Sequence, residues 1–497
     1  MRLGVEAVAD VDQRGVYTAT TSATASELTY ELVRVDGQWR IDSLPSGLLL
    51  SEVAFGNVFR SAPVMFLTPD GGSLVPDVRF VPTRNAVSYA LDRLLTGPAD
   101  WLAPAVTTRA GSGITLEQPG AGVTVEDGSQ VAEVRLTGAG DLDEVGRTQL
   151  YAQVDATLRS ITGVSGVSLW LDGNPFEPGA DLPRPTRADD VVPDRLVGLA
   201  DGELVVVTDG VVEPYVGSGD EADGDGVPTD PSDPGDATDP SGADAAGAAT
   251  PSSGATATPT PPATASPPPP LPPGLSRPAP AYREQDGVAV LQDGDRLLHV
   301  SPSGAVSVLA TGRDLLAPTQ DRWGWILTGE HDNEGELTAV RPDGTTVAVE
   351  ADPLVGHVVQ VRLSRDGTRA AVTTEREGLT RVRVVALVRD RDGVPLRVVD
   401  GPVLLDDLAA GYGAVWVSGS EVAVLAATEE GAVPGVRSAL VTGPVSQVST
   451  TTQAVAIAGG NGLGELVLST ADGRLLGRVS LRWEELAAGV TDPAYPG

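Results

Sequence analysis

The sequence predicts an α+β domain followed by an all-β propeller of about six blades. Two patterns lead to this prediction. Strands flank an amphipathic helix within residues 74–101, and valine-rich strand–turn–strand units recur through the second half of the chain. The composition agrees with both patterns, because 59 Gly and 40 Pro beside only 5 Phe are typical of a β-rich protein with many turns.

The segment 1–47 predicts β hairpins. The pair Asp36-Gly37 separates two β-rich runs, and Trp39 and Ile41 lie in the second run. An Asp-Gly pair in this position is a strong signal for a tight hairpin, but so short a piece cannot bury a core of its own. We therefore expect this segment to pack poorly or to lean on the neighbouring domain.

Residues 57–178 predict the α+β domain. The first helix carries one apolar stripe between Thr83, a candidate N-cap, and Gly97-Pro98, which together stop a helix. A second helix is expected from about Asp143 to Ile161, with acidic residues near its start. Strands flank both helices, so we expect an antiparallel sheet with two helices on one face.

Residues 190–490 repeat a valine-rich strand, a tight turn and another strand. Turns such as Ser303-Gly304, Asp343-Gly344 and Asp472-Gly473 recur at spacings typical of four-stranded blades. Blades bury their faces only against neighbouring blades, so the set should close into a propeller.

A different kind of sequence, rich in Pro and acidic residues, fills 217–280. It holds too few apolar side chains to offset its chain entropy, so it predicts a disordered insert. The entropy of closing a loop grows only with the logarithm of its length. The first blade can therefore carry this insert between its strands.

Several segments resemble one protein family. LVPDVRFVP, LLTGPADWL and the strand that ends in LWLDG are similar to the GerMN domain of the actinobacterial LpqB lipoproteins. APTQDRWGW and VRLSRDGTRAAV resemble the β-propeller of the same family. The resemblance runs from about Arg34 to Trp483, apart from the insert. It implies that residues 1–47 are the remnant of a larger N-terminal lipoprotein domain.

The resemblance also implies a function. It predicts a non-enzymatic, extracytoplasmic accessory protein that binds the extracytoplasmic domain of a sensor histidine kinase. In this role it would modulate two-component signalling and support envelope homeostasis and division. Family members are lipid-anchored to the cell membrane, whereas this chain shows no signal peptide and no lipobox Cys. We expect that its start lies downstream of the true one or that the segment was removed.

The charge of the chain restricts its partners. The formal net charge is −34, and all positive side chains except the three histidines are Arg. Such a surface repels the phosphate backbone of nucleic acid and the anionic headgroups of a membrane. We therefore expect no nucleic-acid partner, and contact with the membrane only through a lipid anchor missing from this chain.

No residue pattern predicts catalysis, a metal or a cofactor. The chain has no Cys, and His299, His331 and His357 are not spaced as metal ligands. The acidic stretch 220–226 lacks the closing Glu of a calcium loop. We expect a protein that is not an enzyme.

Four tryptophans are the candidates for a partner or glycan surface: Trp101, Trp323, Trp325 and Trp416. Trp323 and Trp325 are expected on one face of a strand. Packing between blades is one interpretation, and recognition of a partner or a sugar is the other. The alternative function is therefore binding of peptidoglycan or another envelope glycan. Exposure of Trp101 or Trp323 would favour it, and burial of both would count against it.

Overall fold

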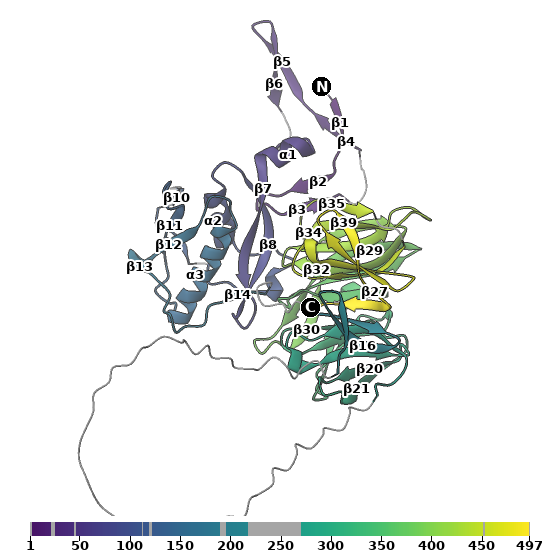
Figure 1. Cartoon of the computed structure of the whole chain (residues 1–497). Coiled ribbons are helices and arrows are strands. Elements are labelled where there is room, and N and C mark those ends of the chain that lie inside the picture. The colour runs from purple at the N-terminus through teal and green to yellow at the C-terminus, as the bar shows by residue number, and fades with distance from the viewer. Residues whose placement is uncertain are drawn as a thin grey trace, which may run out of the picture.

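The structure is a computed structural model. It describes residues 2–20, 25–43, 46–111, 113–118, 122–188, 195–216, 270–450 and 453–496. It contains an N-terminal segment of paired strands, an α+β domain and a β-propeller domain (Figure 1). The predicted fold class, an α+β domain followed by an all-β propeller, is confirmed.

The N-terminal segment consists of three two-stranded antiparallel pairs and one short helix. Its elements are β1 (Arg2–Glu6), β2 (Ala9–Val11), β3 (Tyr17–Ala19), β4 (Ala25–Thr29), β5 (Glu31–Val35), β6 (Gln38–Ser43) and α1 (Glu52–Val58). β5 and β6 form the predicted hairpin, with Asp36 and Gly37 at φ values of 48° and 80° in a two-residue turn. Both strands are exposed along their whole length, and the hairpin projects from the molecule (Figure 1).

The α+β domain folds around two helices that pack against two separate sheets. Its elements are β7 (Phe59–Leu67), β8 (Ser73–Pro82), α2 (Ala86–Thr96), η1 (Ala103–Ala105), β9 (Thr115–Leu116), β10 (Thr124–Val125), β11 (Val131–Thr137), α3 (Glu144–Arg159), β12 (Gly166–Leu171), β13 (Asn174–Phe176) and β14 (Thr186–Arg187). Side chains from both helices and both sheets share one core, including Phe66, Leu91, Val134 and Leu158.

The sheet arrangement differs from the single antiparallel sheet expected for this domain. One sheet has the order β14-β8-β7, and the other has the order β10-β11-β12-β13 with β9 beside β11. β11 and β12 run parallel. The reason is that α3 lies between them in the chain and returns it to the end at which β11 began, which is the crossover that parallel strands require.

The two long helices have different N-terminal caps. Asp143 caps α3 and accepts a hydrogen bond from the backbone N–H of Gly146 at 2.7 Å, so this helix starts where predicted. α2 is preceded by Asn85 in a left-handed conformation without a side-chain cap, so the prediction of Thr83 as the N-cap was wrong. Gly97 ends α2 with a φ of 98°, as its lack of a Cβ allows.

The propeller domain contains the remaining strands. They are β15 (Leu196–Ala200), β16 (Glu203–Thr208), β17 (Val211–Pro214), β18 (Leu275–Pro280), β19 (Val288–Gln292), β20 (Arg296–Val300), β21 (Val306–Thr311), β22 (Thr319–Gln320), β23 (Ile326–Thr328), β24 (Asp332–Asn333), β25 (Glu336–Val340), β26 (Thr346–Glu350), β27 (Gly356–Leu363), β28 (Arg369–Arg376), β29 (Leu379–Arg389), β30 (Pro395–Val399), β31 (Val403–Leu408), β32 (Ala410–Ser418), β33 (Glu421–Ala427), β34 (Gly435–Leu440), β35 (Val445–Thr450), β36 (Ala454–Gly459), β37 (Leu466–Thr470), β38 (Arg474–Val479), β39 (Arg482–Ala488) and β40 (Val490–Ala494). Short 3-10 turns interrupt them at η3 (Glu284–Asp286), η4 (Asp352–Leu354) and η5 (Leu463–Glu465).

The propeller closes by pairing its last strand with its first. β40 lies antiparallel to β15, in the four-stranded sheet β17-β16-β15-β40. Three further sheets have four strands each, and one sheet runs continuously through ten strands from β22 to β31. The number of blades, about six, stays a prediction, because strands from neighbouring blades are joined in that larger sheet.

The insert predicted at 217–280 lies mostly outside the described residues, as does the acidic stretch 220–226. Its final part is a strand rather than a coil, because β18 pairs antiparallel with β19 and Leu275 is buried. β18 is the end strand of the sheet β18-β19-β20-β21. A Pro is tolerated there, since an edge strand does not need every backbone N–H for a neighbour. The predicted end of the insert at 280 is therefore corrected to a position before Leu275.

Candidate functional site

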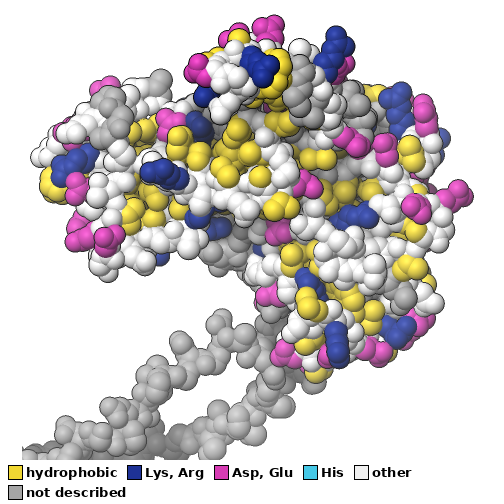
Figure 2. All heavy atoms as spheres, turned by 90° about the horizontal axis from the view of Figure 1, so that it is seen from above, with side chains coloured by type: hydrophobic (Ala, Val, Ile, Leu, Met, Phe, Trp, Pro, Cys, Tyr) yellow, Lys and Arg dark blue, Asp and Glu magenta, His cyan; other side chains and the backbone are white. Residues whose placement is uncertain are grey.

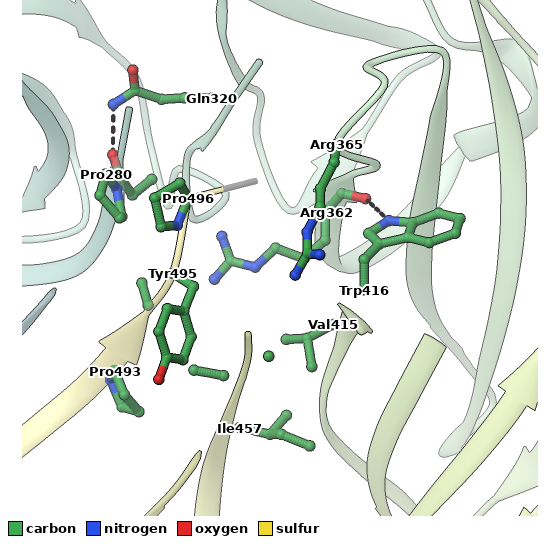
Figure 3. Close-up of a pocket in the computed structure, with 14 residues that line it drawn as sticks. Pro280, Gln320, Arg362, Arg365, Val415, Trp416, Ile457, Pro493, Tyr495 and Pro496 are labelled. Atoms are coloured by element: carbon green, nitrogen blue, oxygen red, sulfur yellow. Dashed lines mark hydrogen bonds between the residues drawn. The ribbon is translucent and has the colours of Figure 1, made fainter. Parts of the chain in front are cut away.

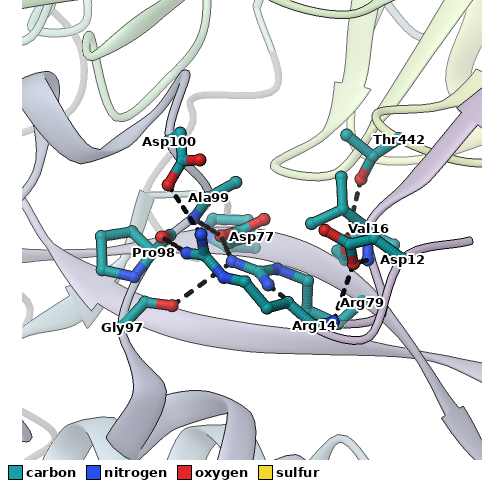
Figure 4. Close-up of polar contacts among 12 residues, drawn as sticks. Asp12, Arg14, Val16, Asp77, Arg79, Gly97, Pro98, Ala99, Asp100 and Thr442 are labelled. Atoms are coloured by element: carbon teal, nitrogen blue, oxygen red, sulfur yellow. Dashed lines mark hydrogen bonds and ion pairs between the residues drawn. The ribbon is translucent and has the colours of Figure 1, made fainter.

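A three-way junction joins the N-terminal segment, the α+β domain and the propeller. It is built around the loop that follows α2, Gly97 to Trp101 (Figure 4). Arg79 on β8 is almost fully buried, and its Nη2 lies 2.6 Å from a carboxylate oxygen of Asp77. The same oxygen accepts a hydrogen bond from the backbone N–H of Ala99 at 2.7 Å. A buried charge pair therefore fixes this loop to the sheet.

The N-terminal segment is attached to the same loop. The guanidinium of Arg14 contacts the carboxylate of Asp100 at 2.6 Å and donates to the carbonyl of Pro98. In return, Arg79 donates to the backbone carbonyl of Arg14 at 3.0 Å (Figure 4). These contacts tie residues that are distant in sequence into one network.

Gly15 allows the two backbones to approach closely. Its carbonyl accepts a hydrogen bond from the N–H of Phe80 at 2.7 Å, and its φ is +79°. A Cβ at this position would lie 2.5 Å from the carbonyl oxygen of Phe80, so only Gly fits. The rings of Tyr17 and Phe55 then pack on the Phe80 ring at centroid distances of 5.5 and 5.0 Å. This part of the N-terminal segment leans on the α+β domain, as predicted.

The propeller meets β8 through a buried cation. Arg369 at the start of β28 donates to the carbonyl of Pro76 at 3.1 Å, forms an ion pair with Asp366, and lies 5.0 Å over the ring of Trp416. Burial would raise the pKa of Asp366, but Arg369 and two hydrogen bonds from Thr368 outweigh it and hold that pKa below its usual value. The charge of Arg369 is thus compensated inside the interface.

Trp101 connects the cores of the two domains. Its ring is half-buried and packs against the core of the α+β domain and also against a propeller core that contains Val382 and Val384. Gly401 of the propeller lies so close that a Cβ there would be 2.9 Å from the Trp101 ring. The structure therefore uses this candidate residue for packing between domains.

Trp323 also lies at the boundary between domains. Its Nε1 donates to the carboxylate of Asp70 at 3.2 Å, and the Arg389 guanidinium lies 4.7 Å over its ring. Arg389 is in turn 2.6 Å from the buried carboxylate of Asp321. Burial raises the pKa of Asp321, and Arg389 with two backbone N–H groups offsets only part of this effect.

The other two candidate tryptophans are buried within the propeller. Trp325 stacks under the guanidinium of Arg341 at 4.3 Å, and the Nε1 of Trp416 donates to the carbonyl of Arg362 at 3.0 Å. Trp323 and Trp325 lie in the turn between β22 and β23, so the expectation that both lie on a strand was wrong. The intervening Gly324 has a φ of +80°, which suits a turn.

Sequence reasoning missed one exposed tryptophan, Trp39 on β6. Its side chain is 68 % exposed, and Ile41 on the same face is 55 % exposed. Leu32 and Arg34 of β5 lie directly opposite Ile41 and Trp39. We call these four residues the hairpin face. The exposure of Trp39 could have been predicted from the sequence, because a two-stranded hairpin with no layer above it has nothing against which to bury a large ring.

The exposed apolar side chains continue beyond the hairpin face. Leu48, Leu49 and Val53, beside and within α1, are also exposed. Figure 2 views the molecule from above and shows hydrophobic side chains exposed at many places on this face. On the hairpin face itself, Trp39 and Ile41 are two residues apart on one strand and form neighbouring exposed apolar groups, which mark an interaction site more often than scattered single residues do.

Within the described residues, no three His, Asp or Glu side chains come together as metal ligands. His331 and His357 stack with their ring centroids 5.7 Å apart, and His357 contacts Asp332 at 3.0 Å. His299 contacts the backbone carbonyl of Asp286 at 2.7 Å. In the described part of the chain, no helix combines the length and the hydropathy that a membrane span requires.

Three family models match the chain. The lipoprotein LpqB beta-propeller domain matches residues 247–496, the lipoprotein LpqB N-terminal domain matches residues 1–56, and the sporulation and spore germination model matches residues 63–177. The order of the matches agrees with the order of the three structural parts.

Related proteins carry the name lipoprotein LpqB. The one from Cutibacterium acnes is 26% identical over 502 residues, which cover 97% of this chain and 79% of that protein. The one from Thermobifida fusca is 32% identical over 194 residues, 36% of this chain, and the match spans only 29% of that protein. The names of these relatives state a lipoprotein and no enzyme activity.

Among solved structures, TolB from Acinetobacter baumannii has a TM-score of 0.39 and 15% identity, with 71% of this chain and 73% of that chain covered. A nidogen/laminin complex has a TM-score of 0.39 and 8% identity, with 61% of this chain and 98% of that chain covered. Because the LpqB propeller model alone matches half of the sequence, and the LpqB N-terminal model matches its start, the chain belongs to the LpqB lipoprotein family.

Proposed function

We propose that this chain is a non-enzymatic extracytoplasmic accessory protein. It binds the extracytoplasmic domain of a sensor histidine kinase, adjusts two-component signalling, and so supports envelope homeostasis and division. A lipid anchor holds the protein at the cell membrane. Membership of the LpqB lipoprotein family supports an accessory role.

The observation that carries this proposal is the hairpin face. It combines Trp39, Ile41 and Leu32 with the cation Arg34, and Trp and Arg are the residue types that most often dominate binding energy at protein interfaces. Each strand of the hairpin also has one edge without a neighbour among the described strands. A strand of the partner can pair with such an edge through its backbone.

The three-way junction connects the N-terminal segment, which carries the hairpin, to the α+β domain and the propeller. Arg14 and Gly15 fasten the N-terminal segment to β8, and Arg369 fastens β8 to the propeller. A partner on the hairpin face is therefore attached, through the rest of the N-terminal segment, to a connected two-domain body. This suits an adaptor that presents one surface to a kinase and leaves the propeller surface free for other contacts.

A titration tests the proposal. The purified chain is passed over two surfaces, one carrying the extracytoplasmic domain of the kinase from the same cell and one carrying its peptidoglycan. We expect saturable binding to the kinase domain. The double variant Trp39→Ser, Ile41→Ser should weaken that binding by at least tenfold, because it removes the exposed apolar anchors.

Leu481→Ser is the matched control, since Leu481 is 83 % exposed on the propeller, far in sequence from the hairpin face. It should bind like the unchanged chain. Binding to peptidoglycan alone would reject the kinase proposal and favour the glycan alternative. That alternative has less support here, because Trp101 and Trp323 are both engaged between domains.

A further inference from the structure

Two histidines lie side by side where two groups of propeller strands meet. His331 directly precedes β24, and His357 is the second residue of β27. β24 pairs with β27, although its neighbours in the chain, β23 and β25, pair with each other. The rings of His331 and His357 stack with their centroids 5.7 Å apart and their planes at 25°. The fold thus brings together two imidazoles that are far apart in the sequence.

Hydrogen bonds assign the tautomer of both rings. The Nδ1 of His331 lies 2.6 Å from the backbone carbonyl of Val358, and the Nδ1 of His357 lies 3.0 Å from a carboxylate oxygen of Asp332. A carbonyl and an ionised carboxylate only accept, so each Nδ1 carries the proton and each neutral ring keeps a lone pair on Nε2. No hydrogen bond within the described part of the chain occupies either Nε2. An Nδ1–H held in this way is the arrangement that orients a histidine for binding a metal ion through Nε2.

Carboxylates flank this histidine pair. Within the sheet, His357 lies directly opposite Asp332 of β24 on one side and Glu375 of β28 on the other. Directly opposed residues have their Cβ atoms about 4.5–5.5 Å apart on one face of the sheet, so the exposed Glu375 lies within reach of an ion held by His357. These two negative side chains, in a chain whose formal net charge is −34, favour a cation at this place.

We propose that His331 and His357 together bind one divalent transition-metal ion, such as Zn²⁺, through their Nε2 atoms. Two imidazoles that bind one zinc ion tetrahedrally, with Zn–N distances of about 2.0–2.1 Å, have their ring centroids roughly 5 Å apart. The observed separation of 5.7 Å is close to that value. Water completes the coordination shell, and Glu375 can serve as a further ligand. Imidazole nitrogens favour Zn²⁺ over Mg²⁺ and Ca²⁺, which prefer oxygen ligands.

A metal ion suits the space in the propeller better than an organic ligand does. The cavity lined by Arg362 and Trp416 (Figure 3) has a volume of about 30 Å³, which leaves room for roughly two water molecules. The histidine pair needs no cavity, because the His357 side chain is 45 % exposed and accessible to an ion from solution. An ion bound there connects β24 to β27 and so holds two groups of propeller strands together.

Calorimetric titration of the full chain with zinc chloride tests this site, with magnesium chloride as the comparison salt. We expect saturable binding of one Zn²⁺ ion and a rise in the unfolding temperature with Zn²⁺ concentration, because the ion binds the folded chain. Mg²⁺ should cause neither. His331→Gln and His357→Gln should each weaken Zn²⁺ binding by about tenfold or more, since each leaves attachment through a single imidazole. Asp343→Asn, which removes an exposed carboxylate in the turn between β25 and β26, should leave it unchanged.

The double variant His331→Gln, His357→Gln separates one shared site from two independent ones. It should bind Zn²⁺ little more weakly than either single variant, because one substitution already breaks the shared site. Losses that add up in the double variant would overturn the proposal, and so would equal binding by the unchanged chain and the double variant. The half-exposed His357 decides the matter if His331→Gln fails to fold, as judged by circular dichroism. None of these outcomes bears on kinase binding, which involves the hairpin.

Discussion

Two tryptophans, Trp39 in the N-terminal segment and Trp101 in the loop after α2, show how much the same residue type can differ in role. Trp101 is packed between the cores of the α+β domain and the propeller, whereas Trp39 stands exposed on a two-stranded hairpin. Trp101 lies in the loop after α2, and Trp39 follows the turn at Asp36-Gly37. The difference comes from what lies opposite each ring, since only the junction provides a second apolar layer.

Arginine side chains also have different surroundings at the junction and on the hairpin. At the junction, Arg369 and Arg79 are buried, and each contacts a carboxylate and a backbone carbonyl. On the hairpin, Arg34 is exposed and donates to the carbonyl of Gly37 at 3.2 Å. A buried cation without its partners is costly, whereas an exposed cation is solvated by water. The junction should therefore be sensitive to mutation and the hairpin tolerant.

The largest expected effect is at Arg369. Arg369→Ala removes the ion pair with Asp366, the hydrogen bond to Pro76 and the packing on Trp416, and it leaves the Asp366 carboxylate buried without its cation. We expect a loss of about 3–5 kcal/mol in the free energy of unfolding, measured by urea denaturation. Arg376→Ala, at an exposed position on β28, is the control. A loss below about 1 kcal/mol for Arg369→Ala would show that the interface is weaker than its contacts indicate.

The two tryptophans give the most direct comparison. Trp101→Ala should lower the free energy of unfolding by about 3 kcal/mol, because it opens a cavity between two cores. Trp39→Ala should change it by less than about 0.5 kcal/mol, because the ring is largely in solvent already. Thermal unfolding of both variants beside the unchanged chain measures this. Similar losses for both variants would mean that the hairpin is packed against something in solution.

Gly15→Ala separates the attachment of the N-terminal segment from the stability of the body. The added Cβ would meet the carbonyl of Phe80, and the left-handed conformation would be strained, at a local cost of about 1–3 kcal/mol. We expect faster hydrogen exchange in β1 to β6 with little change in the propeller. Gly37→Ala in the exposed hairpin turn has the same positive φ but no close neighbour, so it should not loosen β2 and β3. Unchanged exchange in Gly15→Ala would contradict the attachment described here.

The smallest expected effect is a pH dependence at Asp70. Burial would raise its pKa, but hydrogen bonds from Thr68 and Gly72 and the charge of Arg322 together lower it below 3.8. Because the folded-state pKa is lowered, the stabilisation is present above about pH 4 and is lost as the pH falls through the folded-state value. Asp70→Asn should cost about 1 kcal/mol or less at pH 6.

The cost of Asp70→Asn should shrink toward zero as the pH falls through the lowered folded-state pKa of Asp70, because the carboxyl of the unchanged chain then becomes protonated too. Thermal unfolding at several pH values measures the difference between the two proteins. Asp392→Asn, at an exposed position in the turn before β30, should show no such convergence. A constant difference across the pH range would assign the effect of Asp70→Asn to shape and not to charge.

Local sequence determined much of the fold. The apolar stripe of α2 with Gly97 at its end, the cap at Asp143, and the Asp36-Gly37 hairpin all appear where predicted, because each depends on residues within one turn or one helix. The recurring strand–turn–strand units predicted the propeller for the same reason. Their closure through β40 and β15 follows from the need of every blade for a neighbour.

Only the tertiary structure decided which of these residues face another domain and which face solvent. The parallel pairing of β11 with β12, the stacking of Arg369 on Trp416 and the placement of Trp101 between two cores all depend on contacts between segments far apart in the chain. A sequence pattern records that a side chain is apolar or charged, but not what lies opposite it. For that reason the sequence identified the hairpin of Trp39 but not the exposed face to which Trp39 belongs.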